Sequence, residues 1–384
     1  MSAAIATSDP RASAAGADVL RAGGNAVDAA ATAAFVLYVV EPQSCGIGGD
    51  AFMLIHDGSG PPLGLDGSGL VPVGLTRAAL EADGLDNVPA RGAKTATPPG
   101  AVALLAHALA GHGTISLAEA IAPALRFAAD GFAVRPSLAD AARRATAELA
   151  DQPVLGPLYW PGGVPVGVDD IVVNHDLASA LRVVAAQGGQ ALTTGSLAVA
   201  IVEAIEAQGG YLTSADLAAH RTTSITPESV EFAGHRVWQM PAPTQGPAVL
   251  EALAALSSTE PVDWEAAYRA VASGMAAAGF DPAAVRVGTP SPAKGDTTFI
   301  AAVDRDGVGV SLITSVFGDF GSHLGIRALG GPIHNRATTF RLSTRPIQPG
   351  KPPHTTIPGM ITNADGSLAY VMGVAGGVMQ PQAQ

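Results

Sequence analysis

The amino-acid sequence predicts an α+β fold in which antiparallel strands lie against apolar helices. Residues 298–303 and 309–314 are apolar runs rich in Val, Ile and Phe, separated by the turn sequence Asp-Arg-Asp-Gly at 304–307. The Asp-Gly step favours a positive φ, so the two runs predict a β-hairpin. Residues 26–40 are apolar on nearly every side and rich in Ala, which is typical of a helix buried against a sheet.

The composition narrows the possible functions. Of the 384 residues 48% are hydrophobic and 14% are charged, so the chain can bury a large core. The net charge of −12 argues against nucleic acid or an anionic membrane as a partner. A single Cys excludes an internal disulfide framework. The histidines show no metal-binding spacing such as HExxH, so we expect no metal and no cofactor.

The N-terminal segment carries no recognisable export signal. The first twenty residues lack a basic region followed by an apolar core. The longest apolar run, residues 29–40, is too short to span a bilayer. We therefore expect a cytoplasmic protein.

The N-terminal part of the chain alternates between strand and helix signals. Asn25 stands where it can cap the following helix, with Asp28 three residues later in capping-box position. The sequence CGIGGD at 45–50 lacks the spacing of a nucleotide-binding loop, so we interpret it as a tight turn and Cys45 as a small buried residue. The predicted strands are 3–7, 51–56 and 63–66, and the predicted helices are 10–21 and 26–40.

The rest of the chain before the hairpin is predicted to be mainly helical. Between residues 76 and 221 we expect helices at 102–111, 117–129, 136–150, 177–186 and 197–207. A further helix is predicted at 247–256, and the polar stretch 290–296 is suited to an exposed loop. After the hairpin we expect a loop at 321–331 and strands at 358–362 and 368–374, on either side of an Asn-Ala-Asp-Gly turn.

The residues directly before the hairpin could carry reactive groups that an ordinary strand does not need. Cleavage between Asp296 and Thr297 would give Thr297 both a hydroxyl and a free α-amine. Such an amine has a pKa of about 8, so near neutral pH it can act as the base for its own hydroxyl. The same residues also fit the ordinary start of a strand, and the local pattern leaves both interpretations open.

Two stretches resemble the γ-glutamyltransferase family. The sequence GDTTFIAAVDRDG followed by TSVFGDFGS is similar to the start of that family's small subunit, and AGGNAVDAAATAAFVLYVVEPQSCGIGGDAFML is similar to its N-terminal signature. CGIGGD looks more like the branch with cephalosporin-acylase-like proteins. The resemblance implies an N-terminal-nucleophile hydrolase with a four-layer αββα sandwich. Residues 1–296 would form a large-subunit-like segment and residues 297–384 a small-subunit-like segment of one domain.

The resemblance also implies a catalytic role for individual residues. It places the cleavage site at Asp296 and Thr297 and makes Thr297 the nucleophile. Ser315 matches a family Thr that forms a hydrogen bond with the nucleophile. The backbone N–H groups of Gly376 and Gly377 match the oxyanion hole, where preoriented donors stabilise a developing negative charge.

The implied substrate pocket departs from the family pattern. Ser68 stands where the family has an Arg that holds the substrate's α-carboxylate. Thr338 and Thr339 stand where the family has an Asp that holds the α-ammonium. The substrate-binding residues implied by the resemblance are Ser68, Phe317 (replacing an Asn), Thr338, Thr339, and Thr355 and Thr356, which replace two serines.

We therefore expect a self-processing amidohydrolase or acyltransferase, similar to a glutathione hydrolase, that cleaves γ-glutamyl or related acyl amides. Water or an amine would accept the acyl group. Cleavage would leave a heterodimer of large and small subunits, and further dimerisation stays open. The alternative is an unprocessed, catalytically weak homologue that binds a ligand or a partner chain. Phe317 and the short stretch before Thr297 favour the alternative, whereas the Asp-Thr-Thr start and the Gly pair favour the enzyme.

Overall fold

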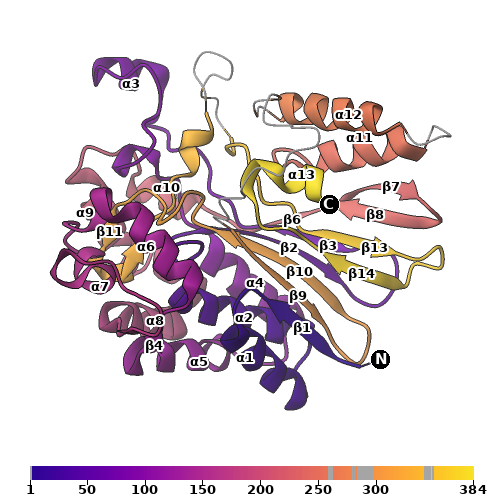
Figure 1. Ribbon diagram of the computed structural model, residues 1–384, viewed down its shortest axis with the longest axis horizontal. Coiled ribbons are helices and arrows are strands. Elements are labelled where there is room, and N and C mark those ends of the chain that lie inside the picture. The colour runs from indigo at the N-terminus through magenta and orange to yellow at the C-terminus, as the bar shows by residue number, and fades with distance from the viewer. Residues whose placement is uncertain are drawn as a thin grey trace.

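The computed structural model describes residues 2–257, 263–278, 280, 282, 297–340, 347 and 350–384. Within these ranges the chain is a mixed fold of helices and strands with two larger antiparallel sheets (Figure 1). The sheets lie against each other, and helices cover the face that each turns away from its neighbour. The predicted α+β class is therefore confirmed at this level.

The larger sheet has six strands and contains the predicted hairpin at its centre. The turn is held by Asp304, whose Oδ1 accepts the N–H groups of Asp306 and Val308, each at 3.0 Å. Gly307 has a φ of 87°, as the Asp-Gly signal predicts. In sheet order the strands are β1 (Ala4–Thr7), β9 (Thr298–Val303), β10 (Gly309–Ser315), β2 (Asp50–His56), β3 (Leu63–Asp66) and β6 (Thr223–Ile225).

The helix α2 (Ala26–Val40) lies on this sheet and is buried at every position. The Asn25 side chain accepts the N–H groups of Val27 and Asp28, and the Asp28 carboxylate accepts the N–H of Asn25, so the predicted capping box is present. Asp304 Oδ2 accepts the N–H of Ala26 at 3.1 Å, which joins the hairpin turn to the start of the helix. The small Ala side chains allow α2 to lie close to β9 and β10.

The smaller sheet was only half anticipated. Its strands are β14 (Leu368–Met372), β13 (Gly359–Thr362), β8 (His235–Gln239) and β7 (Glu228–Phe232), in that order. Our sequence analysis predicted β13 and β14 but assigned no strand to 228–239. The helix α11 (Gly246–Ser257) covers this sheet and packs against α12 (Trp264–Ala277), and the short α13 (Gln380–Ala383) follows at the C-terminal end (Figure 1).

The segment between β3 and β6 is mainly helical, as predicted, although it also contains the short strand pair β4 (Phe132–Ala133) and β5 (Ile171–Val172). The predicted loop 321–331 likewise contains a small strand pair, β11 (Gly325–Ile326) with β12 (Gly331–Pro332). The remaining helices are α1 (Pro10–Arg21), α3 (Arg77–Ala82), α4 (Ala101–His112), α5 (Leu117–Asp130), α6 (Pro136–Leu149), α7 (Gly156–Tyr159), α8 (His175–Gln187), α9 (Ser196–Glu206) and α10 (Ser214–Ala219).

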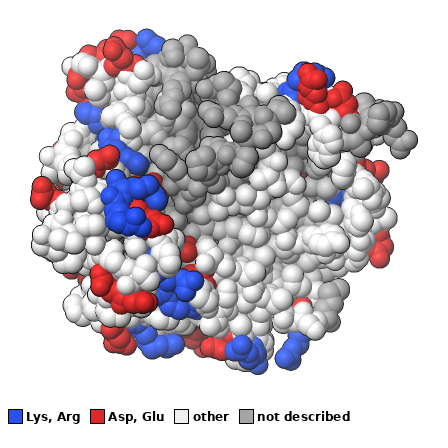
Figure 2. All heavy atoms as spheres, in the orientation of Figure 1, with Lys and Arg blue, Asp and Glu red and all other residues white. Residues whose placement is uncertain are grey.

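Among the described residues, no single helix has the length and apolar character needed to cross a membrane. Only the pair 175–192 and 196–206, bent by 66°, meets both requirements when its two parts are taken together. On the face shown in Figure 2, acidic and basic side chains are intermingled over the helical part at the left, and the centre of the visible face carries few charges.

Alternation along the central strands determines which side chains meet between the two sheets. Phe52 and Leu54 of β2 pack against Trp238 and Met360 of the smaller sheet. Met53, the residue between them, belongs to the core on the helical side. Because successive side chains of a strand point to opposite faces, the first residue of β2, like Phe52 and Leu54, faces the space between the sheets.

Candidate active site

Three side chains form a row where the central strands of the larger sheet end. Thr297 directly precedes β9, Ser315 is the last residue of β10, and Asp50 is the first residue of β2. Ser315 is paired with Asp50, and Thr298 is paired with Thr314, which places Thr297 opposite Ser315. Paired residues of neighbouring strands point to the same face. Thr297, Ser315 and Asp50 therefore lie side by side and face the smaller sheet.

The row brings the predicted nucleophile and its predicted partner together. The Thr297 hydroxyl donates a hydrogen bond to Ser315 Oγ at 3.3 Å. Thr297 faces the smaller sheet and is only 6% exposed. The backbone N–H of Phe317 donates to the same Ser315 Oγ at 2.8 Å. Ser315 can therefore fix the position of the Thr297 hydroxyl, although the catalytic role of both residues stays a prediction. Asp296 lies outside the described residues.

On the side of the sheet that faces the helices, a buried carboxyl group holds the first residue of β9. Glu41, directly after α2, accepts the hydroxyl of Thr298 at 3.0 Å and the hydroxyl of Ser8 at 2.7 Å. Burial raises the pKa of Glu41, and the two hydroxyl donors act in the opposite direction. Thr298 is thus anchored beneath the sheet, which fixes the backbone of Thr297 on the other side.

Asp50, the third residue of the row, forms a fully buried ion pair with Arg336 that the sequence analysis missed. Arg336 Nε lies 3.1 Å from Asp50 Oδ2, and both side chains have no exposed surface. The ring of Phe317 covers the guanidinium, with its centroid 4.6 Å from Cζ. Phe317 has a φ of 76°, an uncommon conformation for a residue with a side chain. Removing one partner of a buried pair typically costs about 3–5 kcal/mol, because the other charge is left uncompensated.

His334 lies against this pair as a neutral ring. Its Nδ1 accepts the backbone N–H of Arg336 at 3.2 Å, and its Nε2 lies 3.0 Å from the carbonyl of Thr97. Nε2 therefore carries the proton, so the 3.6 Å approach of Nδ1 to Asp50 is a contact without an ion pair. Burial lowers the pKa of His334, which agrees with this assignment.

Ser68 lies next to a charged pair formed by Asp66 and Lys351. Its hydroxyl and its backbone N–H donate to Asp66 Oδ1 at 2.6 and 2.8 Å. The Lys351 ammonium lies 2.8 Å from Asp66 Oδ2, an ion-pair distance, although its orientation is not that of a hydrogen bond. The carboxylate of Asp66 is thus shared between Ser68 and Lys351.

The predicted threonine contacts are buried, and two of them already have partners. Thr338 and Thr339 lie in the single turn 336–339, where their hydroxyls donate to the carbonyls of Asn335 and Arg336 at 2.8 and 2.9 Å. Thr355 and Thr356 are also buried. The role of these four threonines as substrate contacts stays a prediction.

The predicted oxyanion-hole residues follow the last strand of the smaller sheet. A Cβ at Gly373, directly after β14, would lie 2.5 Å from the ring of Phe299, two residues after Thr297. The chain then turns at Gly377, whose φ of 56° suits glycine. The segment of Gly376 and Gly377 is therefore carried towards the end of β9, and its role as an oxyanion hole stays a prediction.

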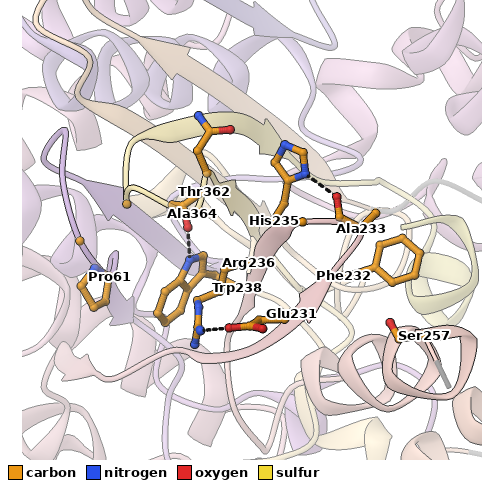
Figure 3. A pocket seen from close by; sticks show the side chains of 14 residues that line it. Pro61, Glu231, Phe232, Ala233, His235, Arg236, Trp238, Ser257, Thr362 and Ala364 are labelled. Carbon is orange, nitrogen blue, oxygen red and sulfur yellow. Dashed lines mark hydrogen bonds and ion pairs between the residues drawn. The ribbon is translucent and has the colours of Figure 1, made fainter.

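Figure 3 shows a separate pocket, whose lining includes none of the three residues of the row. It has a volume of about 650 Å³ and lies between the turn after β2, which contains Pro61, and the β7–β8 turn. Trp238 forms part of its wall and donates to Thr362 Oγ1 at 2.9 Å. The six-residue step along β2 from Asp50 to His56 spans about 20 Å, which separates this pocket from Thr297.

Three histidines near the Asp50–Arg336 pair predict acid sensitivity. Burial lowers the pKa of His220 to about 4 and also lowers the pKa values of His334 and His354. The unfolded chain takes up these protons near pH 6.5, so the stabilisation from the neutral histidines is complete above that pH and is lost as the pH falls; for His220 this loss continues towards about pH 4. Glu41 acts in the opposite direction, because its raised pKa lets the folded chain bind at most one proton more than the unfolded chain at this group. We expect stability to fall as the pH drops from 6 to 5, by up to about 1.4 kcal/mol per pH unit for each histidine that stays neutral in the folded chain.

Urea unfolding of the uncut Thr297→Ala chain at pH 7, 6 and 5 measures this slope. His220→Gln in the same background is expected to reduce it by about 1.4 kcal/mol per pH unit, the contribution of one proton. A stability that is independent of pH in this window would contradict the assignment of neutral buried histidines.

The whole chain is similar to known amide-cleaving proteins and to one family model. The family model described as gamma-glutamyltranspeptidase matches residues 12–278 and 270–384. The chain is 30% identical to an acylase ACY 1 proenzyme of a Pseudomonas species, covering 97% of this chain and 76% of that protein. It is also 30% identical to an oxamate amidohydrolase proenzyme of Klebsiella pneumoniae, covering 95% and 77%.

Solved structures show the same relationship. A cephalosporin acylase from Bacillus halodurans superposes with a TM-score of 0.88 at 34% identity, covering 99% of this chain and 78% of that one. The gamma-glutamyltranspeptidase of Helicobacter pylori superposes with a TM-score of 0.67 at 26% identity, covering 73% and 85%. The resemblance inferred from the two sequence stretches is confirmed: the chain belongs to the gamma-glutamyltranspeptidase family, in its acylase-like branch.

Proposed function

We propose that this chain is an acyl-amide hydrolase or acyltransferase that cleaves itself before Thr297 and then uses Thr297 as its nucleophile. The observation that carries the proposal is the row at the end of the central strands, where the Thr297 hydroxyl is held by Ser315 at 3.3 Å. Residues 1–296 and 297–384 would become the two subunits of one domain. Its two sheets and outer helices would correspond to the four-layer αββα sandwich.

The chemistry follows from the two groups that one N-terminal threonine would carry. Thr297 Oγ attacks the carbonyl carbon of the amide while the α-amine of Thr297 takes the hydroxyl proton. The carbonyl oxygen becomes an oxyanion, which the N–H groups of Gly376 and Gly377 stabilise. The tetrahedral intermediate expels the amine, which receives the proton, and leaves an ester on Thr297. Water or a second amine then attacks the ester and regenerates the hydroxyl.

The names of the relatives support an amide substrate without fixing the acyl group. They include an acylase, an oxamate amidohydrolase and a glutathione hydrolase, the last from Escherichia coli at 33% identity over 63% of this chain. Each is named a proenzyme, which supports self-processing. We propose γ-glutamyl or related acyl amides as the substrate class, with weak activity on glutathione because Ser68 and Thr339 offer no charges for its amino-acid end.

A trapped acyl-enzyme tests this proposal. The purified protein is mixed with a p-nitrophenyl ester of a short carboxylic acid, quenched with acid and analysed by intact mass. We expect the fragment that begins at Thr297 to gain the mass of the acyl group, and peptide mapping to place the group on Thr297. A label on another residue, or none together with an uncut chain, would favour the alternative of an unprocessed homologue that binds a ligand or partner.

A further inference from the structure

A polar pocket lies on the helical side of the larger sheet. It has a volume of about 560 Å³, a size typical of sites for small ligands. Its walls come from α4, from residues 189–194 and from residues 218–222, which lead from α10 into β6. Because α4 packs against α2, β2 and β3, the pocket belongs to the layer of helices (Figure 1). Its lining includes none of the three residues of the row that contains Thr297.

Small residues form the floor of this pocket. Ala103, Ala106, Gly189 and Ala218 contribute no side chain larger than a methyl group. A Cβ at Gly189 would lie 3.1 Å from the Cα of Ala103, so the two backbones approach each other closely there. No acidic residue is among the described residues that line the pocket, although the chain carries 33 acidic and 21 basic residues. The pocket therefore combines an apolar floor with a local lack of negative charge.

Arg221 gives the pocket a positive charge. Its Nη1 donates to the backbone carbonyls of Ala218 and His220 at 2.6 Å each, which fixes the position of the guanidinium. In the part of the chain that the structure describes, its Nε and Nη2 have no hydrogen-bond partner and no carboxylate lies within ion-pair distance. A guanidinium held in this way presents N–H groups that match the oxygens of a carboxylate or a phosphate.

Two buried polar groups at the inner end of the pocket also lack partners. His220 is only 4% exposed, yet its Nε2 has no hydrogen-bond partner among the described residues. The hydroxyl of Thr222 is likewise buried without a partner there. Both residues line the pocket. Because a buried polar group without a hydrogen bond is unfavourable, this end of the pocket is suited to a polar group of a ligand.

The ring of His220 closes the inner end against α4. A Cβ at Gly100, the residue before α4, would lie 2.6 Å from His220 Nε2, so the absence of a side chain there makes room for the ring. Ala103 and His107 continue the same face of α4 into the pocket. Burial lowers the pKa of His220 to about 4, so the ring is neutral near pH 7 and can either donate or accept a hydrogen bond.

We propose that this pocket binds a small organic molecule that carries a carboxylate or phosphate group. The anionic oxygens pair with Arg221, the body of the molecule lies on the floor of small residues, and a polar group at its other end reaches His220 or Thr222. A ligand with an ammonium group is disfavoured, because no acidic residue of the described lining would balance its charge. The inference concerns binding alone and does not depend on the proposed catalytic function.

Binding of two anions that share this chemistry tests the proposal. The purified protein is titrated with 4-hydroxybenzoate and with phenyl phosphate, and binding is followed by ligand-observed NMR. The control ligand 4-hydroxybenzamide has nearly the same shape as 4-hydroxybenzoate but no charge. We expect the better anion to bind roughly 10-fold more tightly than the amide, and its identity to show whether a carboxylate or a phosphate is preferred. No binding of either anion, or equal binding of the amide, would overturn the proposal.

Substitutions locate the bound anion. Arg221→Gln removes the charge and is expected to raise the Kd of the better anion about 10-fold, whereas Arg221→Lys keeps a charge and loses less. Ala106→Leu fills the floor without changing any charge and is also expected to weaken binding. The matched control Arg126→Gln, at an exposed position of α5, leaves the Kd unchanged. The Tm of each variant confirms that it is folded. An unchanged Kd in Arg221→Gln or in Ala106→Leu would place the anion elsewhere and contradict the proposal.

Discussion

Replacement of Thr297 with alanine is expected to lower kcat/KM for any acyl anilide by about 10⁴-fold or more, the scale of loss seen when a nucleophile is removed. Alanine has no Oγ to attack the carbonyl and none to start cleavage of the preceding peptide bond. The substituted chain would therefore lack the nucleophile and also the free α-amine that serves as its base. Initial rates with a p-nitroanilide substrate, at matched concentrations of folded protein, measure the effect.

Two other substitutions give this result its meaning. Thr297→Ser keeps a hydroxyl and is expected to retain part of the activity. Ser315→Ala removes the acceptor of the 3.3 Å hydrogen bond but leaves the nucleophile, so we expect an intermediate loss of about 10-fold, near the value of one hydrogen bond. If Thr297→Ala retained activity within 10-fold of the unmodified protein, the nucleophile would have to be a different residue.

The second large effect concerns the acyl group. A family member that holds both charges of an amino acid gains about 1.5–3 kcal/mol from each charge-assisted contact. Neither contact is available at Ser68 or Thr339, and Asp66 is already shared between Ser68 and Lys351. If Ser68 and Thr339 line the substrate pocket, we expect the absence of both contacts to reduce discrimination in favour of a γ-glutamyl group by about 10²- to 10⁴-fold.

A glutaryl amide differs from a γ-glutamyl amide only by the missing ammonium, and the chain has no acidic residue at 338 or 339, where the resemblance places the partner of that group. We therefore expect a higher kcat/KM for the glutaryl than for the γ-glutamyl p-nitroanilide. The comparison uses one protein preparation and one leaving group, so differences in processing and in the chemistry of the aniline cancel. A preference of 10-fold or more for the γ-glutamyl compound would contradict this account of the pocket.

Local patterns explain what could be predicted about the fold. The turn at Asp304 and the capping box of Asn25 and Asp28 are formed by residues within a few positions of one another, and both are present. Strands β7 and β8 were missed. β7 has the sequence ESVEF and is nowhere fully buried, so it carries no strong apolar alternation, and its pairing with β8 supplies what its composition does not.

The candidate site likewise combines contacts between residues near in sequence with contacts between distant segments. Thr297 and Ser315 belong to one hairpin, so a resemblance along the sequence was sufficient to place them together. Asp50 and Arg336 are 286 residues apart, and nothing in CGIGGD or IHNRATTF alone indicates that they meet. The sequence analysis interpreted Asp50 as part of a tight turn and did not consider Arg336. The available signal was that each charged residue lies next to apolar sequence and has no oppositely charged residue nearby in the chain.

The central claim is self-cleavage before Thr297, and the intact masses of the freshly purified protein test it most directly. On a denaturing gel, and by mass spectrometry, we predict two fragments whose boundary lies between Asp296 and Thr297. We predict a single uncut species in a Thr297→Ala preparation handled in parallel. A single species of 38.3 kDa in both preparations would contradict the account and leave a homologue that keeps the fold without the N-terminal nucleophile.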